Sequence, residues 1–167
     1  YICGLSGKWH LGNSAKPQKS YSHWFAHKSG GGPYYNAPLY KDGVLYNEPR
    51  YVTDVITDDA LEFIDENAGK QPFYLTACYT APHSPWVNNH PKEYTDLYKD
   101  CPFDSIPKEK EHPDSIYLTK EVAKDLRSNL IGYFAAITAM DANIGRIIDK
   151  IESLGIREDT LIVFTSD

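Results

Sequence analysis

The chain has 167 residues, which is long enough for one domain with a hydrophobic core. Its hydrophobic content of 41% and charged content of 24% are those of an ordinary globular protein, and its net charge of −6 argues against a general nucleic-acid binder. No apolar run reaches the roughly 18 residues that a membrane-spanning helix needs. The chain opens on a strand pattern and closes directly after another, so we expect a piece of a longer domain.

The three cysteines, Cys3, Cys78 and Cys101, fit neither a zinc-binding pattern nor a CxxC motif. An odd number gives no disulfide framework, and Cys78 lies in an apolar stretch where a buried thiol is expected. The cysteines therefore indicate no metal centre and leave the redox compartment open.

Residues 1–5 are strand-like and lead into the motif Gly7-Lys8-Trp9-His10-Leu11-Gly12. In an extended segment, residues two apart point the same way, so Lys8 and His10 are expected to face one site. A lysine can neutralise the charge of an anionic substrate, and a histidine can move a proton. An isolated Lys-x-His is also compatible with a basic turn after a strand, so the choice depends on further motifs.

Residues 13–47 are rich in Gly, Pro, Ser and Tyr, with Gly30-Gly31-Gly32-Pro33 at their centre. This composition predicts a long loop, and loops of this length inside a domain are usually functional. Short strands could form within it, at 38–40 and 44–46. His23, Trp24 and His27 could line a substrate cleft, and a packed irregular surface explains them equally well.

A helix is predicted over residues 51–67, where apolar residues recur at steps of three and four: Val52, Val55, Ile56, Ala60, Phe63 and Ile64. The acidic residues of this segment fall mostly on the opposite side and are expected to form a solvated face. Gly69 is expected to end the helix. Residues 72–79 are apolar at nearly every position, which predicts a parallel strand covered on both faces.

The stretch Ala81-Pro82-His83-Ser84-Pro85 follows that strand, and its prolines restrict the backbone around His83. Residues 87–118 are again irregular, with room for a short helix at 91–99. The two histidines of this irregular stretch, His90 and His112, are expected at the surface.

A long helix is predicted over residues 120–154, with Thr119 as its cap and Gly155 as its end. Residues 160–166 are β-branched and apolar, which predicts a strand that ends at Asp167.

Alternation of strands and helices predicts an α/β fold with a mostly parallel sheet. Such sheets bind ligands outside the carboxyl ends of their strands. Lys8 and His10 follow the first predicted strand, His83 follows the second, and Asp167 ends the third. These four residues are therefore the candidate site.

The residue types of this site suit the transfer of a charged tetrahedral group. Lys8, His10 and His83 supply cations or proton carriers, and Asp167 is a plausible ligand for a hard divalent cation. A nucleophile is missing, because local backbone hydrogen bonding explains both nearby serines, Ser6 and Ser84.

Three stretches resemble motifs of the type I, formylglycine-dependent sulfatases, which belong to the alkaline-phosphatase-like superfamily. They are Gly7-Lys8-Trp9-His10-Leu11-Gly12, Ala81-Pro82-His83-Ser84-Pro85, and the run that contains Ala139-Met140-Asp141, Ile144-Gly145-Arg146 and Asp159-Thr160-Leu161-Ile162-Val163-Phe164-Thr165-Ser166-Asp167. The resemblance implies an α/β/α sandwich, a Ca²⁺ held by acidic residues, and a formylglycine made from a Cys or Ser outside this chain.

By this resemblance, Lys8 would bind a sulfate oxygen and the formylglycine, and His10 would hydrogen-bond the formylglycine hydroxyl. His83 would bind sulfate and help to protonate the leaving oxygen, and Asp167 would be a calcium ligand. The implied reaction is the hydrolysis of a sulfuric ester, with release of inorganic sulfate.

The chain also departs from the family pattern. It lacks the C/S-x-P-S/A-R modification motif, the early acidic pair, the Asn that follows Asp167 and the later lysine; the surroundings of Cys3 do not supply the motif. We therefore expect residues 1–167 to be the central part of a single catalytic domain. We also expect this chain alone to be inactive and to bind calcium poorly, because one Asp is a weak site for a hard cation.

Two other functions stay open. A phosphodiesterase or phosphonate monoester hydrolase would use the same residue types, because phosphate and sulfate are nearly isosteric. A non-catalytic carbohydrate-binding relative would have lost the nucleophile. The expected partner is a small-molecule or carbohydrate sulfate ester rather than nucleic acid, and the resemblance favours a secreted, periplasmic or lysosomal location.

Overall fold

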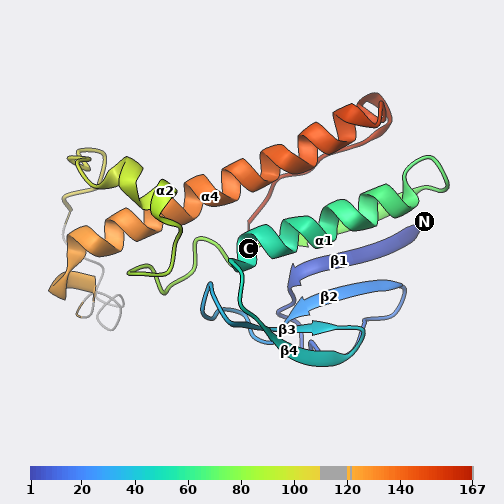
Figure 1. Ribbon diagram of the computed structural model, residues 1–167, viewed down its shortest axis with the longest axis horizontal. Helices are drawn as coiled ribbons and strands as arrows, with labels where there is room; N and C mark the ends of the chain where they lie inside the picture. Colours follow the sequence, from blue (N-terminus) through green and yellow to red (C-terminus); the bar gives the residue numbers. More distant parts are fainter. Residues whose placement is uncertain (110–119, 121, 167) are drawn as a thin grey trace.

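The computed structural model describes residues 1–109, 120 and 122–166. Within these residues, the centre is a five-stranded sheet in the order β4-β3-β2-β1-β5; β1 to β4 are labelled in Figure 1. Its strands are β1 (Ile2–Lys8), β2 (His23–His27), β3 (Ala37–Lys41), β4 (Val44–Glu48) and β5 (Phe73–Cys78). β1 is parallel to β2 and β5, whereas β3 and β4 extend the sheet by antiparallel pairing.

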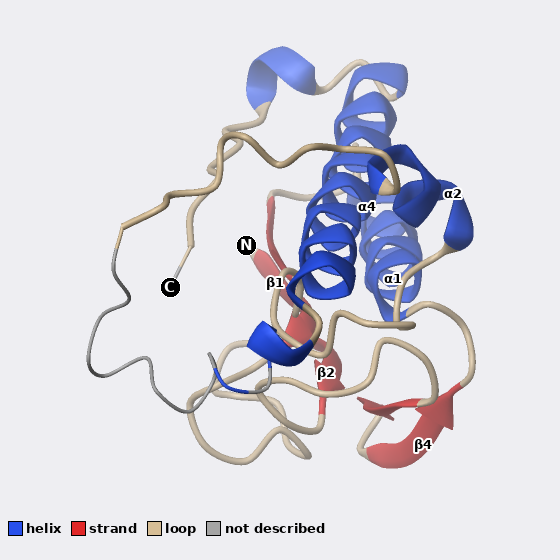
Figure 2. Cartoon of the chain, turned by 90° about the vertical axis from the view of Figure 1, so that its left-hand side faces the viewer, coloured by secondary structure: helices blue, strands red, loops and turns tan. Residues whose placement is uncertain are grey.

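Two long helices lie side by side on one side of this sheet (Figure 2). They are α1 (Val52–Asn67) and α4 (Leu126–Ser153); the shorter elements are α2 (Lys92–Thr95) and the 3₁₀ segments η1 (Asp96–Tyr98) and η3 (Arg157–Asp159). The predicted α/β class is confirmed, with a mixed sheet. Among the described helices, none is long and apolar enough to cross a bilayer.

Small residues on β1 let α1 approach the sheet closely. A Cβ added at Gly4 would lie 2.8 Å from the ring of Phe63, so a larger residue there would push the helix away. Ser6 instead donates a 2.8 Å hydrogen bond to the carbonyl of Ile56. Gly7, which follows, has a φ of 114°, so the extended conformation of β1 is interrupted just before Lys8.

Three strands lie within residues 13–47, where the sequence predicts a long loop. The two short strands considered at 38–40 and 44–46 are confirmed as β3 and β4. They are joined by Asp42 and Gly43, both with positive φ (52° and 77°), as a tight hairpin turn requires. The loop prediction is wrong for β2, which forms because it pairs with β1 and β3 on its two sides.

Helix α1 has the predicted extent to within one residue, and its acidic residues form a solvated face only in part: Glu62 and Asp65 are exposed, whereas Asp54 and Asp58 are half-buried. Asp59 is only 5% exposed. Three other acids have a partner on α4: Asp54 accepts a hydrogen bond from Asn143, Asp58 pairs with Arg146, and Asp65 pairs with Lys150. The prediction is wrong for Asp59 and missed the partners on α4, because periodicity does not reveal what packs alongside a helix.

Helix α4 begins six residues later than predicted, at Leu126. Residues 120 and 122–124 are helical, but Asp125 leaves the helical conformation (φ −146°, ψ 68°) and its carboxylate accepts the N–H of Ser128 at 3.1 Å. Asp125 is therefore the cap, and the predicted cap Thr119 lies outside the described residues. The predicted end is confirmed: Gly155 and Ile156 donate to the carbonyls of Glu152 and Ile151, which closes the last turn.

The predicted strand at residues 160–166 is absent from the structure. Its apolar side chains Leu161, Val163 and Phe164 are 88%, 72% and 76% exposed. A strand exists only when a neighbour completes its hydrogen-bond ladder. Both sides of β1 are taken by β2 and β5, and this segment pairs with no described strand.

Strand β5 forms as predicted but is not covered on both faces. It pairs with β1 alone and lies at the edge of the described sheet. Tyr74, which points away from the helices, is 53% exposed. On that face of the sheet, the covered part is a cluster around Leu5, Trp24 and Ala26, against which Trp9 and Tyr21 pack.

Candidate active site

The candidate site lies where the parallel strands end. β1 ends at Lys8 and β2 at His27, and these two residues are partners in the register of the sheet. β5 ends at Cys78, and the turn that carries His83 follows it. The parallel strands β1, β2 and β5 thus place Lys8, His27 and His83, respectively, at the same edge of the sheet. The sequence predicted this placement for Lys8 and His83.

The glycine loop, residues 30–32, brings the histidines together. A Cβ built on Gly30 would lie 3.0 Å from Nε2 of His10, and one on Gly31 would lie 2.6 Å from Cε1 of His83. Consecutive residues of one loop therefore touch the two predicted catalytic histidines, which are far apart in the sequence. The sequence predicts a functional loop here without linking its glycines to these histidines, although a run of three glycines signals close approach of a backbone to something else.

The turn that carries His83 is held by its backbone. His83 N–H donates to the carbonyl of Thr80 at 2.9 Å, and the Tyr34 hydroxyl donates to the carbonyl of His83 at 2.7 Å. The ring Nδ1 lies 2.7 Å from the carbonyl oxygen of Ser84. A carbonyl can only accept, so Nδ1 carries the hydrogen and Nε2 of the exposed ring is left to accept or donate a proton.

An aromatic cluster supports this turn from inside. Tyr34 is 1% exposed and stacks on Tyr51, whose hydroxyl lies 2.9 Å from Nδ1 of His90. Burial raises the pKa of both tyrosines and lowers the pKa of His90 to about 4, so all three stay neutral near pH 7. The prediction that His90 is a surface residue is wrong, because the chain folds back over Tyr34 and Tyr51; His112 lies outside the described residues.

His27 is a fully buried histidine at the base of the site. Its Nδ1 accepts the N–H of Ser29 at 3.2 Å, and burial lowers its pKa. Its other ring nitrogen, Nε2, has no hydrogen-bond partner among the described residues. His27 was considered as part of a cleft wall, but its ring packs under the loop at Gly32.

Lys8 and His10 are placed differently from each other. Lys8 is half-buried at the end of β1, whereas His10 is exposed beyond the strand. We expected both side chains to face one site because we assumed an extended chain from Lys8 to His10. The strand β1 ends at Lys8, so that assumption does not hold for His10. Their joint action stays a prediction, and Asp167 lies outside the described residues.

The described residues do not provide the metal site or the nucleophile that the resemblance implies. They contain no group of three or more His, Cys, Asp and Glu side chains placed to hold a metal ion. None of the three cysteines forms a disulfide within the described residues. Cys3 is the second residue of β1, at the end opposite Lys8, and Cys78 packs against the cluster on the far face of the sheet. The donor set of this part of the chain therefore does not fit a calcium ion.

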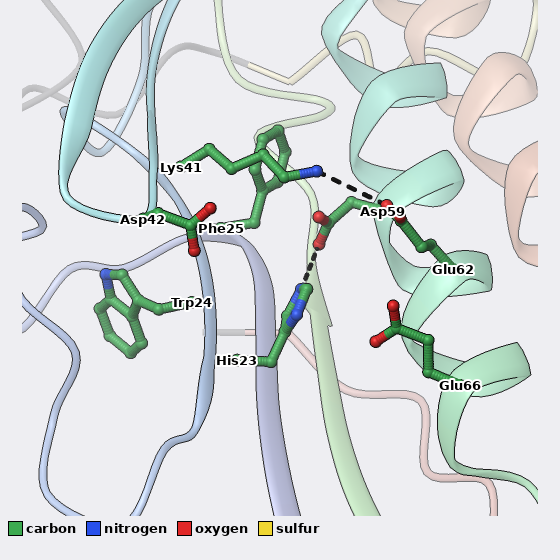
Figure 3. Close-up of a pocket in the computed structure, with 8 residues that line it drawn as sticks. All are labelled: His23, Trp24, Phe25, Lys41, Asp42, Asp59, Glu62 and Glu66. Carbon is green, nitrogen blue, oxygen red and sulfur yellow. Dashed lines mark hydrogen bonds and ion pairs between the residues drawn. The ribbon is translucent and has the colours of Figure 1, made fainter.

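A separate polar pocket of about 190 Å³ lies at the other end of β2 (Figure 3). In it, Nε2 of His23 lies 2.8 Å from the carboxylate of Asp59, and Lys41 pairs with Glu62 at 3.5 Å. The hydrogen bond to Asp59 raises the pKa of His23, although burial opposes it. Because His23 and His27 stand at opposite ends of one strand, this pocket is not part of the candidate site.

An α/β domain that gathers a lysine and histidines at the ends of parallel strands is suited to binding an anionic group. Comparison with known families identifies which domain this is. The chain belongs to the Sulfatase family, because the family model matches residues 1–167.

Similar proteins carry sulfatase names. Matches over the whole chain are found with an N-acetylglucosamine-6-O-sulfatase of Bacteroides thetaiotaomicron at 26% identity, an ulvan-active sulfatase of Formosa agariphila at 28%, and the N-acetylgalactosamine-6-sulfatase of Mus musculus at 27%. The chain spans 42%, 32% and 30% of the length of these three relatives.

Solved structures show the same fold. BT4656, determined in complex with its substrate D-glucosamine-2-N,6-O-disulfate, superposes with a TM-score of 0.65 at 20% identity, over 96% of this chain and 46% of that one. YidJ from Bacteroides fragilis superposes with a TM-score of 0.69 at 24% identity, over 96% and 39%. At these identities the likeness establishes the fold alone.

Proposed function

We propose that the protein that contains this chain hydrolyses sulfuric esters and releases inorganic sulfate, with Lys8, His10 and His83 at the reacting group. Membership of the Sulfatase family supports the reaction. The observation that carries the assignment of residues is the contact of His10 and His83 with adjacent glycines of one loop, beside the strand end that bears Lys8.

The substrate that we propose is a carbohydrate sulfate. Two of the relatives are named for amino-sugar sulfates, and BT4656 was solved with a disulfated glucosamine. His83 and His10 are both exposed, so a sulfated sugar can approach them from solvent. A location outside the cytoplasm, expected from the resemblance, is part of the same proposal.

Each residue has one task in this proposal. The Lys8 ammonium lowers the energy of the charged sulfate oxygens, which carry more charge as the ester bond breaks. His83, protonated on Nε2, gives that proton to the alcohol oxygen as the S–O bond breaks, and becomes neutral. His10, which lies beside Gly30, is the second group that can accept or donate a proton at the reacting group.

The remaining chemistry is not assigned to these residues. In the family, a formylglycine supplies the nucleophile and a Ca²⁺ binds the sulfate. The described residues fit neither group, so no step of the proposal passes through them.

A panel of esters tests the function. The protein, expressed from its complete coding sequence, would be given sulfate, phosphate and phosphonate esters of one chromogenic alcohol in the presence of Ca²⁺. We expect sulfate ester turnover to dominate, and Lys8→Ala to lower it by roughly a hundredfold, as loss of a charge-stabilising group does. Lys70→Ala, which removes an exposed lysine beyond α1, is the matched control and should leave turnover unchanged.

Two other outcomes of this panel would indicate a different function. Preference for the phosphorus esters would move the function to a phosphodiesterase or phosphonate hydrolase. Binding of a sulfated sugar without turnover of any ester would indicate a non-catalytic relative.

A further inference from the structure

The glycines at positions 30 and 31 are required by their neighbours and not by their backbone conformation. Positive φ angles among the described glycines occur at other positions: Gly7, Gly12, Gly43, Gly69 and Gly155. An alanine could therefore adopt the backbone of Gly30 or Gly31 without strain. An added methyl group would instead meet the imidazole ring beside each position, and that exposed ring would have to shift.

The fit is tightest at Gly31. A Cβ at this position would lie 2.6 Å from Cε1, 2.7 Å from Nδ1 and 3.0 Å from Nε2 of His83. At Gly30 a Cβ would lie 3.0 Å from Nε2 and 3.1 Å from Cδ2 of His10. The backbone of the loop thus lies against both rings, and any side chain there would displace them.

The loop is supported from the side of the sheet. The buried ring of His27 accepts the N–H of Ser29, and the Ser29 hydroxyl donates a 2.6 Å hydrogen bond to the carbonyl of Gly31. A Cβ at Gly32 would lie 3.0 Å from Cε1 of His27. The loop therefore rests on His27 and cannot move away from His10 and His83 without breaking these contacts.

We propose that the glycine loop is the positioning element of the site: Gly31 sets the position of the His83 ring, Gly30 sets that of His10, and His27 with Ser29 supports the loop. This inference rests on the proposed function for its effect on catalysis. A proton carrier that is misplaced by about 1 Å can lose roughly a hundredfold in rate, so control of both rings by one loop matters for turnover.

A spectroscopic experiment tests the geometry without relying on activity. In the protein expressed from its complete coding sequence and labelled with ¹³Cε1-histidine, Gly31→Ala should shift the Cε1–H resonance of His83 more than that of His10. Gly30→Ala should do the reverse. Gly145→Ala, where an added Cβ meets no atom within 4 Å, should shift neither resonance. An unchanged His83 resonance in Gly31→Ala would overturn the proposal.

A kinetic double-mutant cycle tests the consequence. Gly31→Ala should lower kcat by roughly tenfold or more in the wild-type background, because a displaced ring transfers its proton poorly. In the His83→Ala background it should cause no further loss, since the ring through which it acts is gone. Losses that multiply would show that Gly31 acts otherwise and would contradict the proposal.

Two further measurements distinguish failure of the loop proposal from failure of the proposed function. If Gly31→Ala does not fold, Ser29→Ala replaces it; we expect a smaller loss of kcat, with recovery in Ser29→Thr, which keeps the hydroxyl that bonds to Gly31. If wild-type protein turns over no sulfate ester, or His83→Ala leaves kcat unchanged, the proposed function fails, and the resonance shifts still decide whether the loop positions the rings.

Discussion

The hydroxyl of Tyr34 donates a 2.7 Å hydrogen bond to the backbone carbonyl of His83. Tyr34 follows the glycine loop almost directly in the chain, so this bond ties the loop to the turn that carries the candidate proton donor. The tyrosine is 1% exposed, and its ring packs between Tyr51 and His90. The position of the His83 backbone therefore depends on a buried hydroxyl, that of Tyr34.

Tyr34→Phe should destabilise the protein and impair catalysis together. It removes the donor to the His83 carbonyl, and loss of such a bond costs about 1 kcal/mol or more in the free energy of unfolding. We expect kcat to fall several-fold with little change in KM, because the His83 ring, the proposed proton donor, becomes less well held. Denaturant titration and steady-state kinetics measure the two effects.

Tyr74→Phe is the control for this prediction. It removes the same hydroxyl from a side chain that is 53% exposed on β5, and should change neither quantity. Equal effects of the two substitutions would show that the Tyr34 hydroxyl has no special role.

The His23–Asp59 pair predicts a pH-dependent contribution to stability. The pKa of His23 is raised in the folded state, first by its hydrogen bond to Asp59. The stabilisation is therefore fully present below the unfolded-state pKa of 6.5 and is lost as the pH rises through the higher folded-state pKa. A double-mutant cycle with His23→Gln and Asp59→Asn should give a larger coupling energy at acid pH than at alkaline pH.

The test compares the His23–Asp59 coupling energy at two pH values. Denaturant titrations would give the coupling energy near pH 5.5 and near pH 9. The same coupling energy at both values would mean that the charge on His23 does not contribute and that a neutral hydrogen bond explains the contact.

Gly132→Ala should disrupt the contact between α4 and the segment that follows His83. An added Cβ at Gly132 would lie 2.2 Å from the carbonyl oxygen of Trp86, which is backbone and cannot rotate away. Such overpacking costs about 1–3 kcal/mol. The thermal midpoint should fall, and turnover should fall with it because this segment directly follows His83 in the chain.

Gly145→Ala is the matched substitution in the same helix. An added Cβ there meets no atom within 4 Å, so the alanine should stabilise the helix by up to about 1 kcal/mol. If both substitutions raised the thermal midpoint, the close packing of Trp86 on Gly132 would be contradicted.

Much of the fold follows from local patterns in the sequence. The apolar spacing of residues 51–67 marks α1 to within one residue, and Gly155 ends α4 as expected. β2 was missed because its five residues lie between Gly-, Ser- and Pro-rich segments. The Asp42-Gly43 pair between apolar residues was a hairpin signal that would have raised the prediction of β3 and β4.

Other features depend on contacts that no local pattern contains. Residues 160–166 have the composition of a strand, but a strand also needs a neighbour to pair with. His90 is buried because its segment folds back over Tyr34 and Tyr51, and Asp59 is buried beside its partner His23. Neither contact leaves a periodic pattern in the sequence.

The candidate site was partly predictable. The rule that ligands bind at the carboxyl ends of parallel strands placed Lys8 and His83 at one edge of the sheet, and the structure places both there. The glycine loop was not predicted as their neighbour, because its link to His10 and His83 crosses large separations in the sequence.

The central claim is that His83 donates a proton to the leaving alcohol of a sulfate ester. The most direct test compares two leaving groups, the hydroxyl of N-acetylglucosamine and nitrophenol, in the protein expressed from its complete coding sequence. A sugar alkoxide leaves poorly without a proton, whereas nitrophenolate leaves readily. His83→Ala should therefore lower kcat/KM by roughly a hundredfold or more for the sugar sulfate and far less for nitrophenyl sulfate.

Lys8→Ala serves as the reference in that measurement, because Lys8 is proposed to bind the sulfate group that both esters share. It should lower kcat/KM for the two esters by similar factors. Equal losses for both esters in His83→Ala would contradict proton donation by His83, and no loss for either would remove His83 from the reaction.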